Sequence, residues 1–442
     1  MIVLLLAACT RSTSPAGHSA TPDPGPLVFA SGRTPTNLLV ITLDTTRRDR
    51  IGRFSGRVDT TPFLDARLAE GVVLEDHRSC SNWTAPSMIC ATTGSSPYEL
   101  GFWPGSGDPE VASVDDDLRT VARSLSHNGY GTTLVTANRI FSDAVLVTAQ
   151  GFDSVTIADY APAEEVAALG RTAVAERRAM GAPWYVHLHF MDPHRPYCPP
   201  ARYLAELDDL PDIGVDVCAG LTDATERYPD EDAAWQAALI ARVDATYRAE
   251  LRSFDDQLAS LWADLDASGA LDDTLVVFYT DHGEQQMERG VIDHGFRLFA
   301  EENRSTALFW AKDLAPRVWT GPTLHTDLAV TLWSLFGLPI PKDASGVVLG
   351  EAPADRTRRV MAYSRVDHGP PQLGVIQPGF ALHYDFAGGR EAHRTTTDPA
   401  ELTDVYDAAD PEVVAAWEEM AAFVDDVSAA FPSAGSPVAA EP

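Results

Sequence analysis

Long apolar runs mark two positions of the chain. Residues 37–43 (NLLVITL) end directly before Asp44, and residues 274–279 (TLVVFY) end shortly before Asp281. Runs of this length, rich in β-branched residues and without polar alternation, predict strands that are buried on both faces of a sheet. Two shorter runs predict further strands, at residues 132–136 and 184–189.

Amphipathic stretches with helical periodicity accompany these runs, at residues 62–70, 118–128, 163–179 and 235–268. Strands that alternate with helices indicate a mostly parallel sheet covered by helices on both faces. The sequence therefore predicts an α/β fold: a three-layer α/β/α sandwich around a mostly parallel mixed central sheet. In such sheets ligands bind at the carboxyl ends of the strands, where Asp44 and Asp281 lie.

The pattern changes after residue 345. Short strand-like pieces at residues 359–363 and 380–384 precede a helical stretch near residues 410–429, which predicts a small antiparallel sheet with a terminal helix packed on it. The Pro/Ala/Ser-rich tail that follows has a composition typical of disorder. These observations divide the chain into a main α/β domain over 37–344, a small C-terminal subdomain over 345–430 and a tail over 431–442.

The amino-terminal segment has a different character. Residues 2–9 (IVLLLAAC) resemble the lipobox of bacterial lipoproteins, although no Lys or Arg precedes the apolar run. We therefore predict a lipoprotein-like signal over 1–9, a lipid anchor at Cys9, a flexible Ser/Thr/Pro/Gly-rich linker over 10–36, and export to the periplasm or the outer membrane. The alternative is an ordinary apolar start with an inert thiol. No apolar run approaches the length of a transmembrane helix.

Net charge limits the partners. The formal charge of −31 disfavours a nucleic-acid partner, because phosphates are repelled at long range. An anionic substrate would meet the same repulsion, so its site would need a metal ion or arginines.

Four further cysteines, Cys80, Cys90, Cys198 and Cys218, suit an oxidising compartment. They allow three disulfide connectivities, of which Cys80–Cys90 with Cys198–Cys218 is the local one. Buried free thiols are the alternative.

The strand-end residues carry the candidate chemistry. Asp44 and the Asp281-His282 pair supply two carboxylates and an imidazole, a ligand set for a divalent cation with an open coordination position. Pro86 favours a helix start, so Thr84 would lie just before a helix, beside unpaired N–H groups suited to an oxyanion. A nearby metal would lower the pKa of its hydroxyl. Taken singly, each aspartate could be a cap, and Thr84 could be a helix N-cap.

Taken together and in order, these segments resemble the sulfatase family of the alkaline phosphatase superfamily. The matching phrases are ITLDTTRRD at residues 41–49, the nucleophile segment at 84–94, DPHRPY at 192–197 and the TDHGE…HG…EE series at 280–302. A near-terminal DPxE phrase lies at 398–401, and the likeness spans about residues 37–425.

Two departures change the chemistry that the resemblance implies. Sulfatases convert a Cys or Ser to formylglycine, whereas this chain has Thr84 there, and Met88 stands in place of the family's arginine. A threonine nucleophile resembles instead the phosphodiesterases, phosphonate hydrolases and phosphoglycerol transferases of the superfamily. We therefore expect an exported metal-dependent hydrolase of an anionic ester on a small molecule, envelope glycan or lipid. The alternatives are a sulfuric ester hydrolase without formylglycine, a phosphoglycerol-type transferase, and a degenerate surface-anchored binding protein.

The resemblance also implies roles for individual residues. One divalent metal ion would be held by Asp44, Thr84, Asp281 and His282; Thr45 replaces a second aspartate, which favours Mn²⁺, Mg²⁺ or Zn²⁺ over Ca²⁺. His194 and His294 would join Thr84 in catalysis, and Asn138, Arg195 and Arg297 would bind substrate. His325 would either hold a second metal or support the site from behind.

Overall fold

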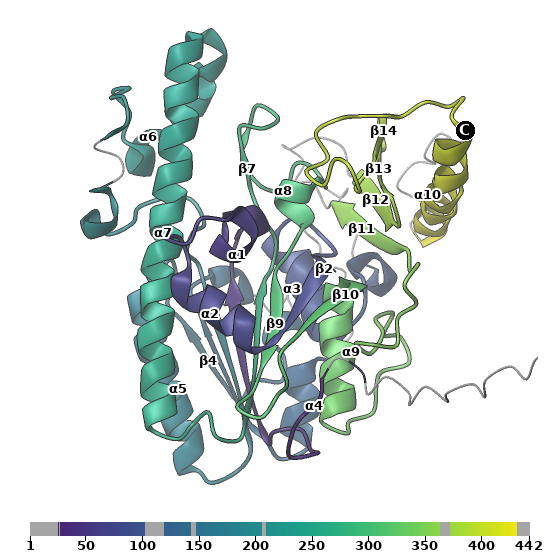
Figure 1. Cartoon of the computed structure of the whole chain (residues 1–442). Coiled ribbons are helices and arrows are strands. Elements are labelled where there is room, and N and C mark those ends of the chain that lie inside the picture. The colour runs from purple at the N-terminus through teal and green to yellow at the C-terminus, as the bar shows by residue number, and fades with distance from the viewer. Residues whose placement is uncertain are drawn as a thin grey trace, which may run out of the picture.

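A computed structural model describes residues 25, 27–101, 119–142, 147–205, 209–362 and 372–430. Its main sheet has eight strands in the order β10-β2-β9-β6-β1-β5-β3-β4 (Figure 1). The four predicted strands lie side by side in it: β6 (Thr274–Thr280), β1 (Asn37–Leu43), β5 (Trp184–Phe190) and β3 (Gly131–Thr136), all parallel.

The remaining strands complete a mixed sheet. β4 (Ser154–Ile157) continues the parallel series beyond β3. On the other side, β9 (Ala307–Trp310) runs antiparallel to both β6 and β2 (Val72–Arg78), and β10 (Arg317–Leu324) pairs in parallel with β2. The predicted mostly parallel mixed sheet is therefore confirmed.

Strand β1 shows why an uninterrupted apolar run belongs at the centre of the sheet. Leu39, Ile41 and Leu43 pack on one face, in a core with helices α2 (Pro62–Glu70), α5 (Ala163–Ala179) and α7 (Ala233–Ala267). Leu38 and Val40 pack on the other face, in a core with α3 (Thr84–Thr93), α4 (Val121–His127) and α9 (His325–Leu335). Figure 1 shows these two helical layers, so the three-layer sandwich is confirmed.

The C-terminal part forms the predicted small antiparallel sheet. Its strands are β11 (Arg358–Ala362), β12 (Gln372–Gln377), β13 (Phe380–Asp385) and β14 (Arg390–His393), with α10 (Pro411–Ala430) packed on them. The same core includes Ala85 and Ile89 of α3, so the small sheet and its helix also pack on the main domain. Shorter elements are α1 (Gly52–Ser55), α6 (Val217–Arg227), α8 (Ala300–Asn303), β7 (Gln285–Gln286) and β8 (Ile292–Asp293).

Both local disulfides are present, Cys80–Cys90 and Cys198–Cys218, so of the three connectivities that the sequence left open the chain adopts the local one, and the alternative of free thiols is wrong. The first ties the segment after β2 to the middle of α3. It therefore restrains the short connection that delivers Thr84 to the start of α3.

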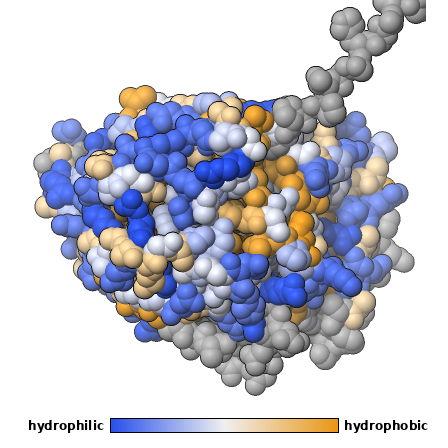
Figure 2. All heavy atoms as spheres, turned by 90° about the horizontal axis from the view of Figure 1, so that it is seen from below, coloured by the Kyte–Doolittle hydropathy of each residue, from blue (hydrophilic) through white to orange (hydrophobic). Residues whose placement is uncertain are grey.

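The predictions for residues 1–9, Cys9, the linker up to residue 24 and the tail 431–442 fall outside the described residues. Within the described ranges, none of the helices combines the length and the apolar character needed to cross a bilayer. On the lower side of the molecule, hydrophilic residues cover most of the surface and surround an apolar area near the centre (Figure 2).

Candidate active site

The site lies where β1 and β6 end. These strands are neighbours with Leu43 opposite Thr280, so the residues that follow them, Asp44 and Asp281, come out at the same edge of the sheet. One ligand atom each of Asp44, Asp281 and His282 lies within 4.8 Å of the others, and all three side chains are fully buried. The structure thus brings together the three predicted metal ligands at these strand ends.

Thr84 completes the cluster. Its Oγ1 lies 3.3 and 3.4 Å from the two carboxylate oxygens of Asp44 and 3.5 Å from Nε2 of His282. Thr84 is the first residue of α3 and not the residue before the helix, because Trp83 occupies the N-cap position. The N-cap role considered for Thr84 is therefore wrong. Its hydroxyl points to the acidic cluster from the positive end of a helix.

Asp44 is fixed by two neighbours. The side-chain amide of Asn138 donates to Oδ2 at 2.9 Å, and Nε2 of His189 lies 3.1 Å from the same oxygen. Asn138, predicted to bind substrate, therefore contacts a candidate metal ligand. His189 was not identified from the sequence. It sits near the end of β5, directly beside β1, and a strand-end position of this kind is the only local signal it offers.

The carboxylate of Asp281 has one satisfied and one unsatisfied oxygen. Oδ1 accepts from the backbone N–H groups of Thr45 at 3.1 Å and of His282 at 2.7 Å. Oδ2 is buried, and no described residue gives it a hydrogen bond. Since a buried carboxylate oxygen without a partner is costly, this atom fits a cation ligand.

His282 is also oriented as a metal ligand would be. Its Nδ1 lies 2.8 Å from the carbonyl oxygen of Gly283, which can only accept, so Nδ1 carries the proton. Nε2 is left with its lone pair facing Thr84 and Asp44. Burial, and then the neighbouring His294, lower the pKa of His282 well below its usual range, which keeps the ring neutral as metal ligation requires.

The two aspartates respond to one another. Burial and the nearby charge of Asp44 raise the pKa of Asp281 well above its usual range. Burial opposes ionisation of Asp44 too, but the hydrogen bond from His189 and the nearby imidazole of His194 lower its pKa. Two carboxylates at this separation repel one another, and a divalent cation between them would remove that repulsion. The residues present therefore fit a metal ion.

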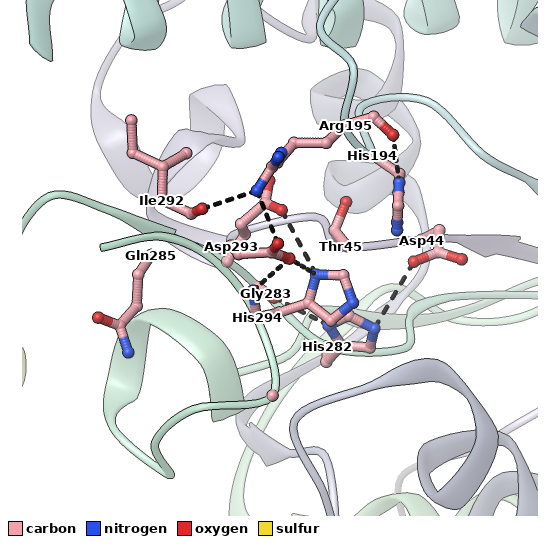
Figure 3. Close-up of polar contacts among 12 residues, drawn as sticks. Asp44, Thr45, His194, Arg195, His282, Gly283, Gln285, Ile292, Asp293 and His294 are labelled. Atoms are coloured by element: carbon pink, nitrogen blue, oxygen red, sulfur yellow. Dashed lines mark hydrogen bonds and ion pairs between the residues drawn. The ribbon is translucent and has the colours of Figure 1, made fainter. Parts of the chain in front are cut away.

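Two further histidines border the cluster (Figure 3). The ring centroid of His294 lies 4.6 Å from that of His282 and 5.1 Å from that of His194. Burial alone would lower the pKa of His294, but a hydrogen bond to Glu284 and the charge of Asp293 raise it to about 9. His294 is therefore protonated at neutral pH and can donate a proton.

The predicted arginines have different surroundings. Arg195 donates to Asp293 at 2.6 Å and to the carbonyl of Ile292 at 3.0 Å, so it holds the segment that carries His294 (Figure 3). The side chain of Arg297 is exposed. His325 does not join the acidic cluster, because its Nε2 lies 3.2 Å from both the carbonyl of Thr280 and the hydroxyl of Ser305.

Comparisons with known proteins agree with this architecture. The sequence model of the family described as Sulfatase matches residues 36–338. Arylsulfatase A of Homo sapiens is 24% identical over 408 residues, which cover 83% of this chain and 78% of the human protein.

Solved structures give the same fold. The structure titled "BT4656 in complex with its substrate D-Glucosamine-2-N, 6-O-disulfate" aligns with a TM-score of 0.73 at 18% identity, covering 92% of this chain and all of that one (100%). Phosphonate monoester hydrolase SpPMH from Silicibacter pomeroyi aligns with a TM-score of 0.68 at 20% identity, covering 89% and 95% of the two chains.

Proposed function

Because this chain belongs to the sulfatase family, and is a hydrolase of sulfuric or phosphoric ester bonds, we propose that it cleaves an anionic phosphodiester or phosphonate ester through the hydroxyl of Thr84. One observation carries the proposal: the Thr84 hydroxyl lies within 3.5 Å of both Asp44 and His282, at the start of a helix. A nucleophile at that position has the Asp44 carboxylate that accepts its hydrogen bond, a set of metal ligands and an anion-stabilising helix end around it.

A divalent metal ion held by Asp44, Asp281, His282 and Thr84 would lower the pKa of the Thr84 hydroxyl and neutralise the substrate's charge. The residues of the chain then have separate tasks. The Thr84 hydroxyl gives its proton to water, and Oγ1 attacks phosphorus in line, forming a bond to phosphorus as the bond to the leaving oxygen breaks. The protonated ring of His294, with His194 beside it, donates a proton to that oxygen. Water then attacks phosphorus, the bond between phosphorus and Oγ1 breaks, and Oγ1 takes up a proton from that water, which releases the phosphate or phosphonate product.

Position 88 supports a phosphorus ester over a sulfate ester. Met88 is buried, and its Sδ lies 3.6 Å from the hydroxyl of Tyr279. The place where the family carries an arginine is therefore filled by an apolar side chain, and Thr84 cannot be converted to formylglycine. Sulfate-ester hydrolysis directly by Thr84 is the alternative.

The test compares substrates on the metal-reconstituted protein. We expect turnover of bis-p-nitrophenyl phosphate or p-nitrophenyl phenylphosphonate at a rate that exceeds turnover of p-nitrophenyl sulfate. Turnover of the sulfate alone would replace the proposed substrate class with sulfate esters. Absence of turnover of every ester, together with absence of metal binding, would refute the enzymatic proposal and favour a binding protein.

We also propose that the protein is exported and lipidated at Cys9. Two disulfides suit an oxidising compartment and support this proposal. Metabolic labelling with radioactive palmitate should mark the wild-type protein and not Cys9→Ala. Equal labelling of both would refute the anchor.

A further inference from the structure

Two adjoining cavities lie between the β2–β10 side of the main sheet and the C-terminal part of the chain. One has a volume of about 460 Å³ and the other about 380 Å³. They share three lining residues, Glu75, Arg304 and Pro399. The described linings of both cavities exclude Asp44, Thr84, Asp281 and His282, so these cavities are distinct from the candidate active site.

Arginines gather around these cavities, and most of them have a carboxylate partner. The ion pairs are Arg48–Glu75 at 3.0 Å, Arg78–Glu401 at 2.8 Å, Arg356–Asp327 at 2.6 Å and Arg358–Asp76 at 2.7 Å. Each pair balances one positive charge with one negative charge. The carboxylates of these four pairs are therefore already bound to other arginines, even though the whole chain carries a formal charge of −31.

Arg304 is the exception. It borders both cavities, yet no residue in the described ranges forms a hydrogen bond or ion pair with its guanidinium. Its side chain is partly buried, so water does not fully solvate the charge. An arginine without an anion in such a place is unfavourable, because guanidinium groups away from solvent are normally paired.

The nearby arginines repel Arg304, while Asp76, Glu401 and Glu75 attract it from beyond ion-pair distance. Burial, followed by repulsion from Arg78, lowers the pKa of Arg304. Burial, followed by repulsion from Arg304, lowers the pKa of Arg48 to about 10. A bound anion would relieve both repulsions at once.

We propose that Arg304 is the centre of a second binding site, which takes a tetrahedral oxyanion, a sulfate or phosphate group. A guanidinium presents parallel N–H donors that match two oxygens of such a group. The hydroxyl-bearing residues Thr320, Thr395 and Thr396 line the smaller of the two cavities, which Arg304 also lines, and offer further donors. The group can come from a free inorganic anion or from a sulfated or phosphorylated glycan.

The test measures binding of inorganic sulfate by isothermal titration calorimetry at low, constant ionic strength. We expect the sulfate affinity of Arg304→Gln to be at least tenfold weaker than that of the wild type. Arg304→Lys keeps the positive charge and loses the parallel N–H donors of the planar guanidinium, so its sulfate affinity should fall between those of the wild type and Arg304→Gln. Arg33→Gln is the matched control, since Arg33 is an exposed arginine that pairs with Asp273 and is not among the described lining residues of either cavity, and this variant should bind as the wild type does.

Two further readouts make the outcome decisive. Without sulfate, Arg304→Gln should unfold at nearly the same temperature as the wild type, because the change breaks no hydrogen bond or ion pair and removes repulsion from Arg78 together with attraction to Asp76, Glu401 and Glu75. Inhibition of esterase turnover by sulfate, which reports the active site, should be unchanged in Arg304→Gln. Equal sulfate affinity in Arg304→Gln and the wild type would overturn the proposal, whether or not the protein hydrolyses esters.

A heparin-derived hexasaccharide distinguishes the two sources. If the site serves a glycan, this probe should bind more than tenfold tighter than inorganic sulfate, and Arg304→Gln should lose that gain. If the site serves a free anion, both probes should bind with similar affinity per sulfate group and with the same dependence on Arg304. Hexasaccharide binding that does not depend on Arg304, together with unaltered sulfate binding, contradicts both sources.

Discussion

The hydroxyl of Thr84 has acidic and imidazole neighbours and no backbone acceptor among its hydrogen bonds. If it is the nucleophile, Thr84→Ala should lower kcat/KM by on the order of 10³-fold or more. The melting temperature should change little, because the helix keeps its N-cap and its core contacts. Stopped assays with bis-p-nitrophenyl phosphate and a thermal melt of each variant measure the two effects.

Thr92 offers a matched control in the same helix. It is also buried, but its hydroxyl donates to the backbone carbonyl of Met88 at 2.7 Å, away from the acidic cluster. Thr92→Ala should therefore keep kcat/KM close to that of the wild type. A fully active Thr84→Ala would remove Thr84 from the mechanism.

His189 is predicted to set the metal affinity through Asp44. Its Nε2 contact at 3.1 Å holds Oδ2, which leaves Oδ1 of Asp44 to face the cation. His189→Ala should weaken binding of Mn²⁺ or Zn²⁺ by roughly 10- to 100-fold, the usual effect of removing a group that orients a metal ligand. Calorimetric titration of the metal-stripped protein measures the change.

His187 is the control for this prediction. It lies two residues earlier on β5, it is equally buried, and it contacts Thr42 at 2.7 Å instead of Asp44. His187→Ala should cost stability and leave the metal affinity nearly unchanged. A similar loss of metal affinity in both variants would mean that any cavity created in this part of the core disturbs the metal site.

Local sequence signals identified some of these residues and not others. Asp44, Asp281 and His282 directly follow apolar strands, and Pro86 marks the helix start near Thr84, so short stretches of sequence were sufficient. His189 and Arg304 have no such mark. A histidine inside an apolar strand looks the same whether it packs in the core or holds a carboxylate on the next strand. Arg304 has no partner among the described residues because neighbouring arginines pair with the carboxylates around it, Arg48 with Glu75 and Arg78 with Glu401. These partners lie far apart in the sequence, so no local stretch shows that Arg304 is left unpaired.

At the scale of elements, the Cys80–Cys90 disulfide restrains the start of α3. It closes a loop of 10 residues that contains Thr84, whereas Cys198–Cys218 closes a loop of 20 residues that does not. Replacing both cysteines of either pair by alanine should destabilise the protein by about 2–4 kcal/mol. Only Cys80→Ala/Cys90→Ala should also lower kcat substantially, because the nucleophile's segment gains freedom.

Denaturant unfolding and steady-state kinetics on the two double variants test this difference. Equal activity in both, at equal loss of stability, would show that the helix start is positioned by packing alone.

The same elements show what sequence can and cannot predict about the sheet. Strands β1 and β6 were found because both of their faces are buried, so every residue in them except the first residue of β1, Asn37, is apolar or β-branched. Strands β2, β4, β9 and β10 were missed. β2 ends in charged residues that pair outside the strand, β4 and β9 have only four residues each, and β10 alternates in burial at the edge of the sheet. The antiparallel direction of β9 is set by tertiary packing and has no local signature.

At the scale of the whole molecule, a buried ion pair joins the main sheet to the C-terminal part. Arg78, the last residue of β2, donates to Glu401 at 2.8 Å, and Nε2 of His383 on β13 lies 3.2 Å from the other oxygen of Glu401. Glu401 is the final residue of the DPxE phrase by which the C-terminal region resembled the family. Breaking a buried pair leaves an uncompensated charge, so both regions depend on it.

This pair predicts how stability changes with pH. Burial alone would raise the pKa of Glu401, but the charge of Arg78 and the hydrogen bond from His383 outweigh it and lower the pKa from 4.5 to about 2. A lowered carboxyl pKa contributes stability that is fully present above the unfolded-state value near 4.5 and is lost as the pH falls toward about 2. Glu401→Gln should therefore be less stable than the wild type by about 3 kcal/mol at neutral pH. The difference should shrink steadily as the pH falls below 4.5.

Urea unfolding of both proteins between pH 7 and pH 3 measures that difference. Glu412→Gln is the control, because Glu412 pairs with Arg394 at 2.8 Å on the surface, where solvent screens the charges, and its loss should leave stability nearly unchanged at every pH. A Glu401→Gln deficit that stays constant from pH 7 to pH 3 would mean that lost packing, and not the charge of Glu401, holds the C-terminal part to the main sheet. A deficit that falls with pH, absent from Glu412→Gln, assigns the connection to this one buried ion pair.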